Sequence, residues 1–253
     1  MRKHEEIPIN KLVGTSYSRI LTYPSSDPTE AKSRVRELSA AGVTALRFSG
    51  LTLIDGIPVL GKGCVGVVTQ GILDGKPVAL KIRRLDADRA TMKDEGRLLR
   101  LANSVNVGPR LIAATKNFLA MELFRGVPLF KWAENSGPSK MRVKQVLSEL
   151  LNACFRLDAI GLDHGELSHA PKNVLVSQTC KPCIVDFESA STVRRVANVT
   201  SILQYFLFGR ISRSLHASRI FLGKGNILKT LGRYKQERSV ESFQRILEAL
   251  NLQ

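Results

Sequence analysis

The chain has 253 residues, of which 43% are hydrophobic and 24% are charged, as in an ordinary globular protein. This length allows one large domain or two small lobes, and the composition excludes a disordered or fibrous chain. The chain carries 38 Lys and Arg against 22 Asp and Glu, a net charge of +16, which favours anionic partners such as phosphates, nucleic acid or acidic proteins.

Several features predict a soluble, cytoplasmic protein. The basic N-terminus is not followed by an apolar segment, so we expect no secretory signal. The most apolar run is too short to cross a membrane, so we expect no membrane partner. Four cysteines in a chain of this length do not make a disulfide framework.

The predicted elements begin with an extended arm or short strand over residues 1–26. An Asp cap followed by Pro predicts a helix from Asp27 to Ala41. Val and Ile runs separated by glycines predict strands over residues 46–83, with a hairpin turn at Asp74-Gly75. A further helix is expected to begin at an Asp cap, at Asp86 or Asp88. The other expected elements are apolar stretches at 110–113 and 118–123, a helix of about twenty residues from Ser139, strands at 174–177 and 183–187, and helices over 193–252.

This order of elements predicts an α+β fold. Strands with one helix among them come first and mostly helices follow, which indicates a small sheet lobe joined to a helical lobe near residue 124. The expected domains are an N-terminal arm and helix over residues 1–45, a sheet lobe over 46–123 and a helical lobe over 124–253.

A glycine motif, Gly61-Lys62-Gly63-Cys64-Val65-Gly66-Val67-Val68, has the spacing G-x-G-x-x-G-x-V. In a dinucleotide-binding fold such a loop opens a helix, but here residues 65–72 have the pattern of a strand that turns at Asp74-Gly75. A glycine loop between two strands, folding its backbone N–H groups over phosphates, is the arrangement of protein kinases. Glycines that serve only a hairpin turn are the alternative.

Lys81 and Glu95 are a candidate ion pair. Lys81 follows Val78-Ala79-Leu80 on the strand behind the turn, where its charge suits a diphosphate unless it is a solvated lysine on an edge strand. Glu95 lies on the apolar stripe of the next predicted helix, where a carboxylate is costly unless it is paired. A solvated helix face, shared with Asp94 and Arg97, is the alternative for Glu95.

Two later segments carry acidic and amide groups. His164-Gly165-Glu166-Leu167 opens a loop that ends at Asn173, and Asp186 follows thirteen residues after Asn173. Carboxylate and amide oxygens brought together by neighbouring strands are suitable ligands for Mg²⁺. Glu166 is a candidate base for an attacking hydroxyl, and we expect His164 to be a structural loop residue rather than a metal ligand.

Over residues 50–210 these features, in this order, resemble the protein-kinase-like superfamily. Within it the likeness is to the small atypical members: the RIO kinases, the kinase of the KEOPS tRNA-modification complex and short archaeal Ser/Thr kinases. The resemblance implies a two-lobed protein-kinase-like fold, with a small antiparallel sheet lobe carrying one helix and a reduced, mainly helical lobe. It also implies no long peptide-docking platform, because Ser189–Arg195 runs directly into a helical pattern.

The resemblance assigns roles to individual residues. Glu166 would be the catalytic base, and Lys81, held by Glu95, would bind the α- and β-phosphates. Asn173 and Asp186 would hold Mg²⁺, or Mn²⁺ in its place. The implied ATP-binding positions are Gly61, Gly63, Gly66, Val68, Ala79, Lys81, Met121, Glu122 and Phe124, with Ala79 over the adenine and Glu122 and Phe124 bonding its edge through their backbone.

Four features depart from the family's pattern. The base is Glu166 where Asp is usual, and six residues separate it from Asn173 where four are usual. Pro171 occupies the position expected for the Asn, and Glu188 stands where Gly usually follows Asp-Phe. These departures leave open a weakened catalyst or a pseudokinase that only binds nucleotide.

The sequence therefore predicts an enzyme, an ATP- and Mg²⁺-dependent kinase that transfers the γ-phosphate of ATP to a Ser or Thr hydroxyl of a protein, its own included. One alternative is a small-molecule kinase of the aminoglycoside or choline type, although the helical lobe is small for an acceptor pocket. The other is a nucleotide-binding scaffold on RNA or a ribosomal particle.

Two remaining segments bear on partners. Residues 194–238 contain ten Lys or Arg and one acidic residue, Glu237. They form either the solvated surface of a basic protein or a platform for RNA, a ribonucleoprotein particle or an acidic protein substrate. Cys180-Lys181-Pro182-Cys183 has no second cysteine pair, so we expect a hairpin turn with incidental cysteines rather than a zinc or redox site.

Overall fold

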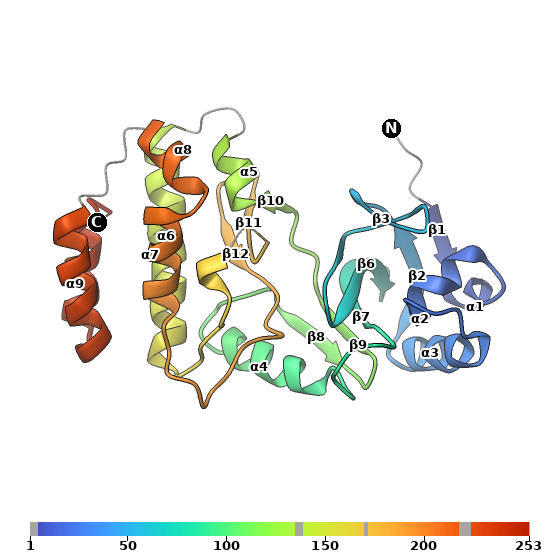
Figure 1. The fold of residues 1–253 in the computed structure, drawn as a ribbon. Helices are drawn as coiled ribbons and strands as arrows, with labels where there is room; N and C mark the ends of the chain where they lie inside the picture. Colours follow the sequence, from blue (N-terminus) through green and yellow to red (C-terminus); the bar gives the residue numbers. More distant parts are fainter. Residues whose placement is uncertain (1–4, 135–138, 170–171, 218–223, 253) are drawn as a thin grey trace. The chain divides into compact units, whose positions relative to one another are not determined.

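The structure is a computed structural model that describes residues 5–134, 139–169, 172–217 and 224–252 (Figure 1). The fold is α+β, as the sequence predicts. The described residues divide into two compact units: residues up to 100 together with 110–123 form the first, and residues 101–109 together with 124–252 form the second.

An antiparallel sheet is the centre of the first unit. Within the described residues its strand order is β1-β2-β6-β7-β9-β8, with β5 paired to β6, and β3 and β4 form a separate hairpin. The central strands carry a β-branched, apolar sequence that suits a pleated surface. The strands are β1 Glu5–Pro8, β2 Val43–Phe48, β3 Thr52–Ile54, β4 Ile57–Val59, β5 Gly61–Lys62, β6 Gly66–Leu73, β7 Lys76–Arg83, β8 Leu111–Ala114 and β9 Phe118–Glu122.

Three N-terminal helices, α1, α2 and α3, cover one face of this sheet (Figure 1). The Asp27 carboxylate accepts hydrogen bonds from the backbone N–H groups of Thr29 and Glu30, both at 2.9 Å, and Pro28 opens the helix, so the predicted α3 is confirmed. The short strand that the sequence predicts as one possibility within residues 1–26 is present as β1, whereas the short helices after it are not in the sequence prediction. The elements are α1 Ile9–Leu12, the 3₁₀ turn η1 Ser16–Ser18, α2 Arg19–Thr22 and α3 Pro28–Ala40.

A buried polar network fixes α3 to the ends of two strands. The fully buried Arg34 guanidinium donates to the carbonyl oxygens of Leu21 and Arg83 and to Asn117 Oδ1. The Glu37 carboxylate accepts from the backbone N–H of Asn117 at 2.8 Å and from its Nδ2 at 2.6 Å. Burial would raise the pKa of the Glu37 carboxyl, but its hydrogen bonds and the nearby Arg34 outweigh burial and lower the pKa.

The predicted hairpin at Asp74-Gly75 is confirmed. Leu73 is paired with Lys76, and both turn residues have positive φ, 49° at Asp74 and 71° at Gly75. A two-residue turn of this kind matches the right-handed twist of the flanking strands, which explains the Asp-Gly pair.

The expected start of the next helix is wrong. Helix α4 spans Lys93–Asn103 and does not begin at Asp86 or Asp88. The Asp86 carboxylate binds the Arg84 guanidinium at 2.6 Å, and the backbone N–H of Lys93 donates instead to Thr91 Oγ1 at 3.2 Å. A local ion pair thus competes with the cap that the sequence pattern suggests.

The second unit is mainly helical. Helices α6 and α7 lie side by side, and β10, β11 and β12 form a small antiparallel sheet (Figure 1). The predicted start of α6 is confirmed, since Ser139 Oγ accepts from the N–H of Arg142. The elements are β10 Gly126–Pro128, α5 Leu129–Glu134, α6 Lys140–Ala159, the 3₁₀ turn η2 Leu167–His169, β11 Val174–Ser177, β12 Pro182–Ile184, α7 Asn198–Phe208, α8 Ile211–Ala217, α9 Lys224–Glu237 and α10 Val240–Ala249.

Strand β12 ends at Ile184, earlier than the expected residue 187, because the chain turns at Asp186, whose φ is +67°. The predicted hairpin turn at Cys180–Cys183 is confirmed, since β11 and β12 pair on either side of it. Among the described residues, no helix has both the length and the apolar character of a membrane span.

Candidate functional site

One face of the first unit's sheet gathers most of the residues expected to bind nucleotide. Val68 is paired with Lys81 across β6 and β7, and Ala79 is paired with Met121 across β7 and β9. Because side chains alternate along each strand, these four residues and Gly66 share one face. The opposite face packs into the apolar core under α1, α2 and α3.

Lys81 and Glu95 form a buried ion pair on this face. Lys81 Nζ lies 2.9 Å from Glu95 Oε1, and the two side chains are only 4% and 3% exposed. Strand β7 lies between β6 and β9, so Lys81 is not a solvated lysine on an edge strand. The solvated alternative for Glu95 is wrong as well.

A glycine in α4 lets the helix approach the sheet closely enough for Glu95 to reach Lys81. A Cβ at Gly96 would lie 2.6 Å from the Cβ of Ala114 and 3.2 Å from Cδ1 of Leu119, which is paired with Lys81. Only glycine permits this approach of helix to strand. Gly96 is not among the site residues predicted from the sequence, although an isolated glycine inside a helical pattern is a signal of close packing.

The glycine motif forms a tight hairpin rather than the start of a helix. β5 pairs with β6, and the N–H of Gly63 donates to the carbonyl oxygen of Gly66 at 2.8 Å. A Cβ at Gly66 would lie 2.9 Å from Cγ of Lys81, so this glycine is required by the lysine behind it. Gly61 has open space within 4 Å and no such requirement. The predicted strand after the motif is confirmed, since the motif leads into β6 and not into a helix.

The expected adenine-binding residues are divided between the two units. Met121 and Glu122 end β9 in the first unit, whereas Phe124 belongs to the second. The backbone N–H of Glu122 donates to the carbonyl oxygen of Arg110 at 2.9 Å. The backbone contact expected of Glu122 with the adenine would thus fall to its carbonyl oxygen.

In the second unit Glu166 is held by two donors. Asn173 Nδ2 donates to Glu166 Oε2 at 2.9 Å, and Ser189 Oγ donates to Glu166 Oε1. The lengthened loop therefore still brings the candidate base and Asn173 to hydrogen-bond distance. Pro171 lies outside the described residues. The sequence analysis did not give Ser189 this role.

A network behind the loop fixes its position. Gly165 has φ +89°, and a Cβ there would lie 2.8 Å from the carbonyl oxygen of Ser189. The Arg194 guanidinium donates to that same oxygen at 2.9 Å and to Asp163 Oδ2 at 2.6 Å. Gly165 is thus needed for the close approach of the 189–194 segment to the loop.

His164 is a structural residue in this geometry. Its ring lies edge-on to Phe187 with centroids 5.0 Å apart, and its Nε2 is 3.1 Å from the carbonyl oxygen of Val185, to which it donates. Burial lowers the pKa of His164 against the opposing effect of that hydrogen bond, so the ring is held neutral.

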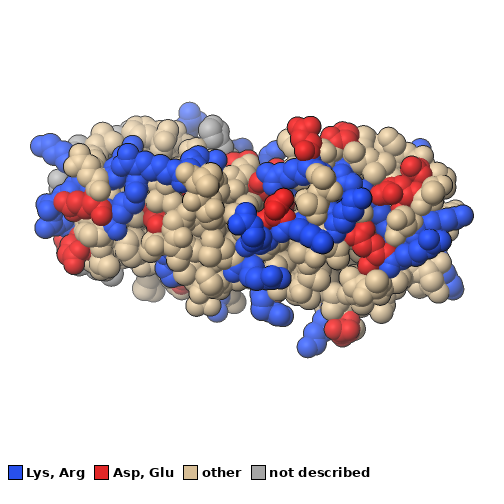
Figure 2. Space-filling view, turned by 90° about the horizontal axis from the view of Figure 1, so that it is seen from below, with Lys and Arg blue, Asp and Glu red and all other residues tan. Residues whose placement is uncertain are grey.

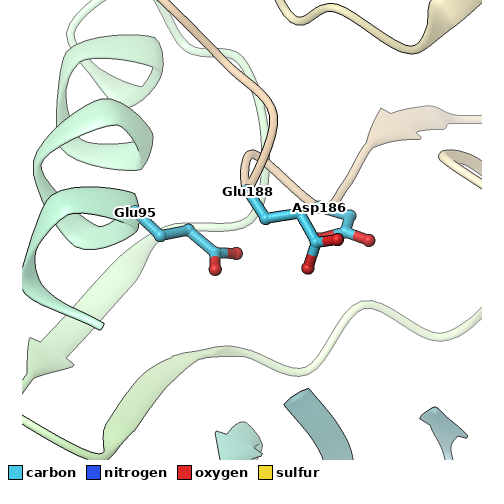
Figure 3. Close-up of side chains that lie close together, drawn as sticks. All are labelled: Glu95, Asp186 and Glu188. Atoms are coloured by element: carbon cyan, nitrogen blue, oxygen red, sulfur yellow. The ribbon is translucent and has the colours of Figure 1, made fainter. Parts of the chain in front are cut away.

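Oxygen ligands suitable for a hard cation lie at the end of β12. The backbone N–H of Val185 donates to the carbonyl oxygen of Asn173 at 2.9 Å, which places Asn173, just before β11, beside the segment after β12 that carries Asp186. Carboxylate oxygens of Asp186 and Glu188 lie within 4.8 Å of each other. Figure 3 shows these two side chains on the segment after β12, and Glu95 on α4 of the first unit. Carboxylates and an amide oxygen fit Mg²⁺ or Mn²⁺, and Glu188 adds a possible third ligand to the expected pair.

The basic segment 194–238 is partly neutralised by carboxylates outside it. Asp163 pairs with Arg194, and Glu134 pairs with Arg210 at 2.8 Å. On the face that Figure 2 draws, Lys and Arg side chains lie over both units, so basic surface is not confined to this segment. Residues 218–223 lie outside the described residues.

Comparison of the chain with models of known protein families finds no match, and neither does comparison with curated proteins.

Proposed function

We propose that this protein is an ATP- and Mg²⁺-dependent phosphotransferase of the protein-kinase-like fold, with Ser or Thr hydroxyls of proteins as acceptors. The observation that carries the proposal is the buried ion pair of Lys81 and Glu95 next to the glycine hairpin, residues 61–66. A buried ion pair contributes little to stability compared with apolar side chains of the same size. Its presence on the face that also carries Gly66 and Ala79 favours a binding role.

In the proposed site each group has a task that its surroundings support. The Lys81 ammonium, held by Glu95, binds phosphate oxygens of ATP, and the backbone N–H groups of the glycine hairpin contact the same phosphates. Ala79 and Met121 offer apolar contacts to the adenine ring. Both lie on the same sheet face as Lys81.

Glu166 acts as the base in this proposal. Its carboxylate accepts the proton of the acceptor hydroxyl as that oxygen attacks the γ-phosphorus, and ADP leaves. Hydrogen bonds from Asn173 and Ser189 hold the carboxylate in one orientation. Asp186 and Asn173 would hold Mg²⁺, which supplies positive charge to the phosphate oxygens when it is bound.

A nucleotide-binding scaffold is the second candidate. Both oxygens of Glu166 already accept a hydrogen bond, one from Asn173 and one from Ser189, and this favours a carboxylate that is structural. Such a scaffold would use the exposed basic side chains of α9, Lys229 and Arg233 among them, to contact RNA or a ribonucleoprotein particle.

The test is incubation of the purified protein with γ-labelled ATP and Mg²⁺, alone and with an acidic protein acceptor. Label on protein is expected, and it should be lost in Lys81→Ala and Asp186→Ala. Lys76→Ala, at the exposed end of the same strand as Lys81, is the matched control and should keep the label. Mg²⁺-dependent ATP binding without label would favour the scaffold. Absence of ATP binding would refute both candidates.

A further inference from the structure

The glycine hairpin, residues 61–66, is held from outside by side chains that the proposed function does not use. Arg84 follows β7, and its guanidinium Nη1 donates to the carbonyl oxygen of Gly63 at 2.9 Å. The backbone N–H of Arg84 donates to the carbonyl oxygen of Val65, also at 2.9 Å. One residue therefore contacts the hairpin at two of its turn positions.

The Arg84 side chain is itself fixed. Its Nε and Nη2 bind both carboxylate oxygens of Asp86, at 2.8 and 2.6 Å, in a bidentate pair. Its guanidinium carbon lies 5.1 Å from the centre of the Tyr23 ring, a cation–π arrangement. The side chain is only 17% exposed. The planar Arg84 guanidinium is held by Asp86 and by the Tyr23 ring, so its Nη1 meets the Gly63 carbonyl oxygen in one fixed geometry.

Tyr23 joins the N-terminal helices to the same hairpin. Lys62 Nζ donates to the Tyr23 hydroxyl at 2.7 Å and lies 4.9 Å from the ring centre. The carbonyl oxygen of Tyr23 accepts from the N–H of Leu85 at 2.9 Å, next to Arg84 in the chain. The segment that follows α2 thus contacts both the hairpin and the residue that supports it.

We propose that Arg84 and Tyr23 are positioning residues that hold the 61–66 hairpin in its phosphate-binding conformation before nucleotide arrives. The proposal rests on the proposed function for the identity of the ligand, a nucleoside triphosphate. A hairpin that is already ordered loses less conformational entropy when the ligand binds. The affinity therefore rises for ligands whose phosphates contact the hairpin, and not for ligands without phosphates. The N-terminal helices, through Tyr23, thereby set the affinity of the site for phosphate.

The first measurement is hydrogen exchange of the protein without nucleotide. The Gly63 amide, which donates to Gly66, and the Arg84 amide, which donates to Val65, report on the hairpin. Both should exchange about tenfold faster in Arg84→Met, because a charge-assisted hydrogen bond to the hairpin is lost. Arg47→Met is the matched control, since Arg47 donates two hydrogen bonds to Glu6 Oε2 away from the hairpin. Unchanged exchange, or faster exchange throughout β6 and β7, would overturn the proposal.

The second measurement compares the dissociation constants of Mg–ATP and adenosine. Arg84→Met should weaken ATP binding about tenfold and leave adenosine binding unchanged, and Tyr23→Phe, which keeps the ring but loses the hydroxyl, should weaken ATP binding about threefold. Equal weakening of ATP and adenosine would overturn the positioning role. If the wild-type protein binds neither ligand, the proposed function fails, and the exchange measurement alone decides whether Arg84 holds the hairpin.

Discussion

The buried pair of Lys81 and Glu95 allows a quantitative test of how this sheet is built. Replacing Glu95 with Leu would remove the carboxylate that lies 2.9 Å from the buried Lys81 ammonium in the wild type. Removal of one partner of a buried ion pair costs about 3–5 kcal/mol of unfolding free energy. We expect a loss in this range, because both side chains are almost fully excluded from solvent.

Replacing both partners should restore most of that loss. In Lys81→Met with Glu95→Leu both charges of the pair are removed together, and replacement of a buried pair by apolar side chains of similar volume is often neutral or stabilising. The expected coupling energy is therefore about 3 kcal/mol or more. A parallel cycle on the exposed Arg47–Glu6 pair, in which Nη2 and Oε2 are 2.6 Å apart, should give about 0–1 kcal/mol.

The assay is urea unfolding followed by circular dichroism, with hydrogen exchange of the β7 amides to assign the change to the first unit. A double variant no more stable than Glu95→Leu would refute the reasoning, as would a loss below 1 kcal/mol in the single variant. The double variant also separates stability from function: it should fold and fail to bind ATP, because the ammonium is gone.

Three further predictions concern other parts of the site. Gly66→Ala should lower the unfolding free energy by about 1–3 kcal/mol, because its Cβ would lie 2.9 Å from Cγ of Lys81, whereas Gly61→Ala should change it by less than about 0.5 kcal/mol; urea unfolding measures both. Glu166→Asp should lower kcat about tenfold with little change in the KM for ATP, because the shorter carboxylate moves away from its two donors. Steady-state kinetics measures both constants, and a kcat that rises would contradict the prediction. Because the folded-state pKa of Glu37 is lowered, its contribution to stability is full above the ordinary Glu pKa of about 4.3 and is lost as the pH falls through the folded value. The unfolding free energy of Glu37→Gln should therefore fall less steeply with decreasing pH in that window than the unfolding free energy of the wild type. Parallel curves of unfolding free energy against pH would contradict this prediction.

The elements that the sequence predicts well are those with a signal inside a few residues. Asp27 caps α3, Ser139 caps α6, and Asp74-Gly75 makes the hairpin, all through contacts within three or four positions. The alternating apolar pattern likewise places Ala79 and Lys81 on one face of β7, and only the register with β6 and β9 is added by the structure.

The parts that the sequence does not predict depend on distant residues. The fully buried Arg34 binds Asn117, 83 positions away, and nothing near Arg34 in the chain distinguishes it from an exposed helix arginine. Asp86 has the sequence position expected of a helix N-cap, but its carboxylate forms an ion pair with Arg84. Gly96 is required because α4 packs closely against Ala114 and Leu119. These residues are distant from Gly96 in the chain, so no local sequence pattern reveals the contact.

The loop from Glu166 to Asn173 shows why two departures from a pattern should be considered together. A Glu in place of Asp lengthens the side chain by one methylene, about 1.5 Å, and in a loop of ordinary length this would carry the carboxylate past its partners. Here six residues, rather than four, separate Glu166 from Asn173, and the two side chains still meet at 2.9 Å, with Ser189 on the other oxygen. The proposed base needs a fixed carboxylate, and we expect either departure alone to lose that position. The longer side chain and the longer loop therefore act as one change, so shortening the side chain alone should impair the site rather than repair it.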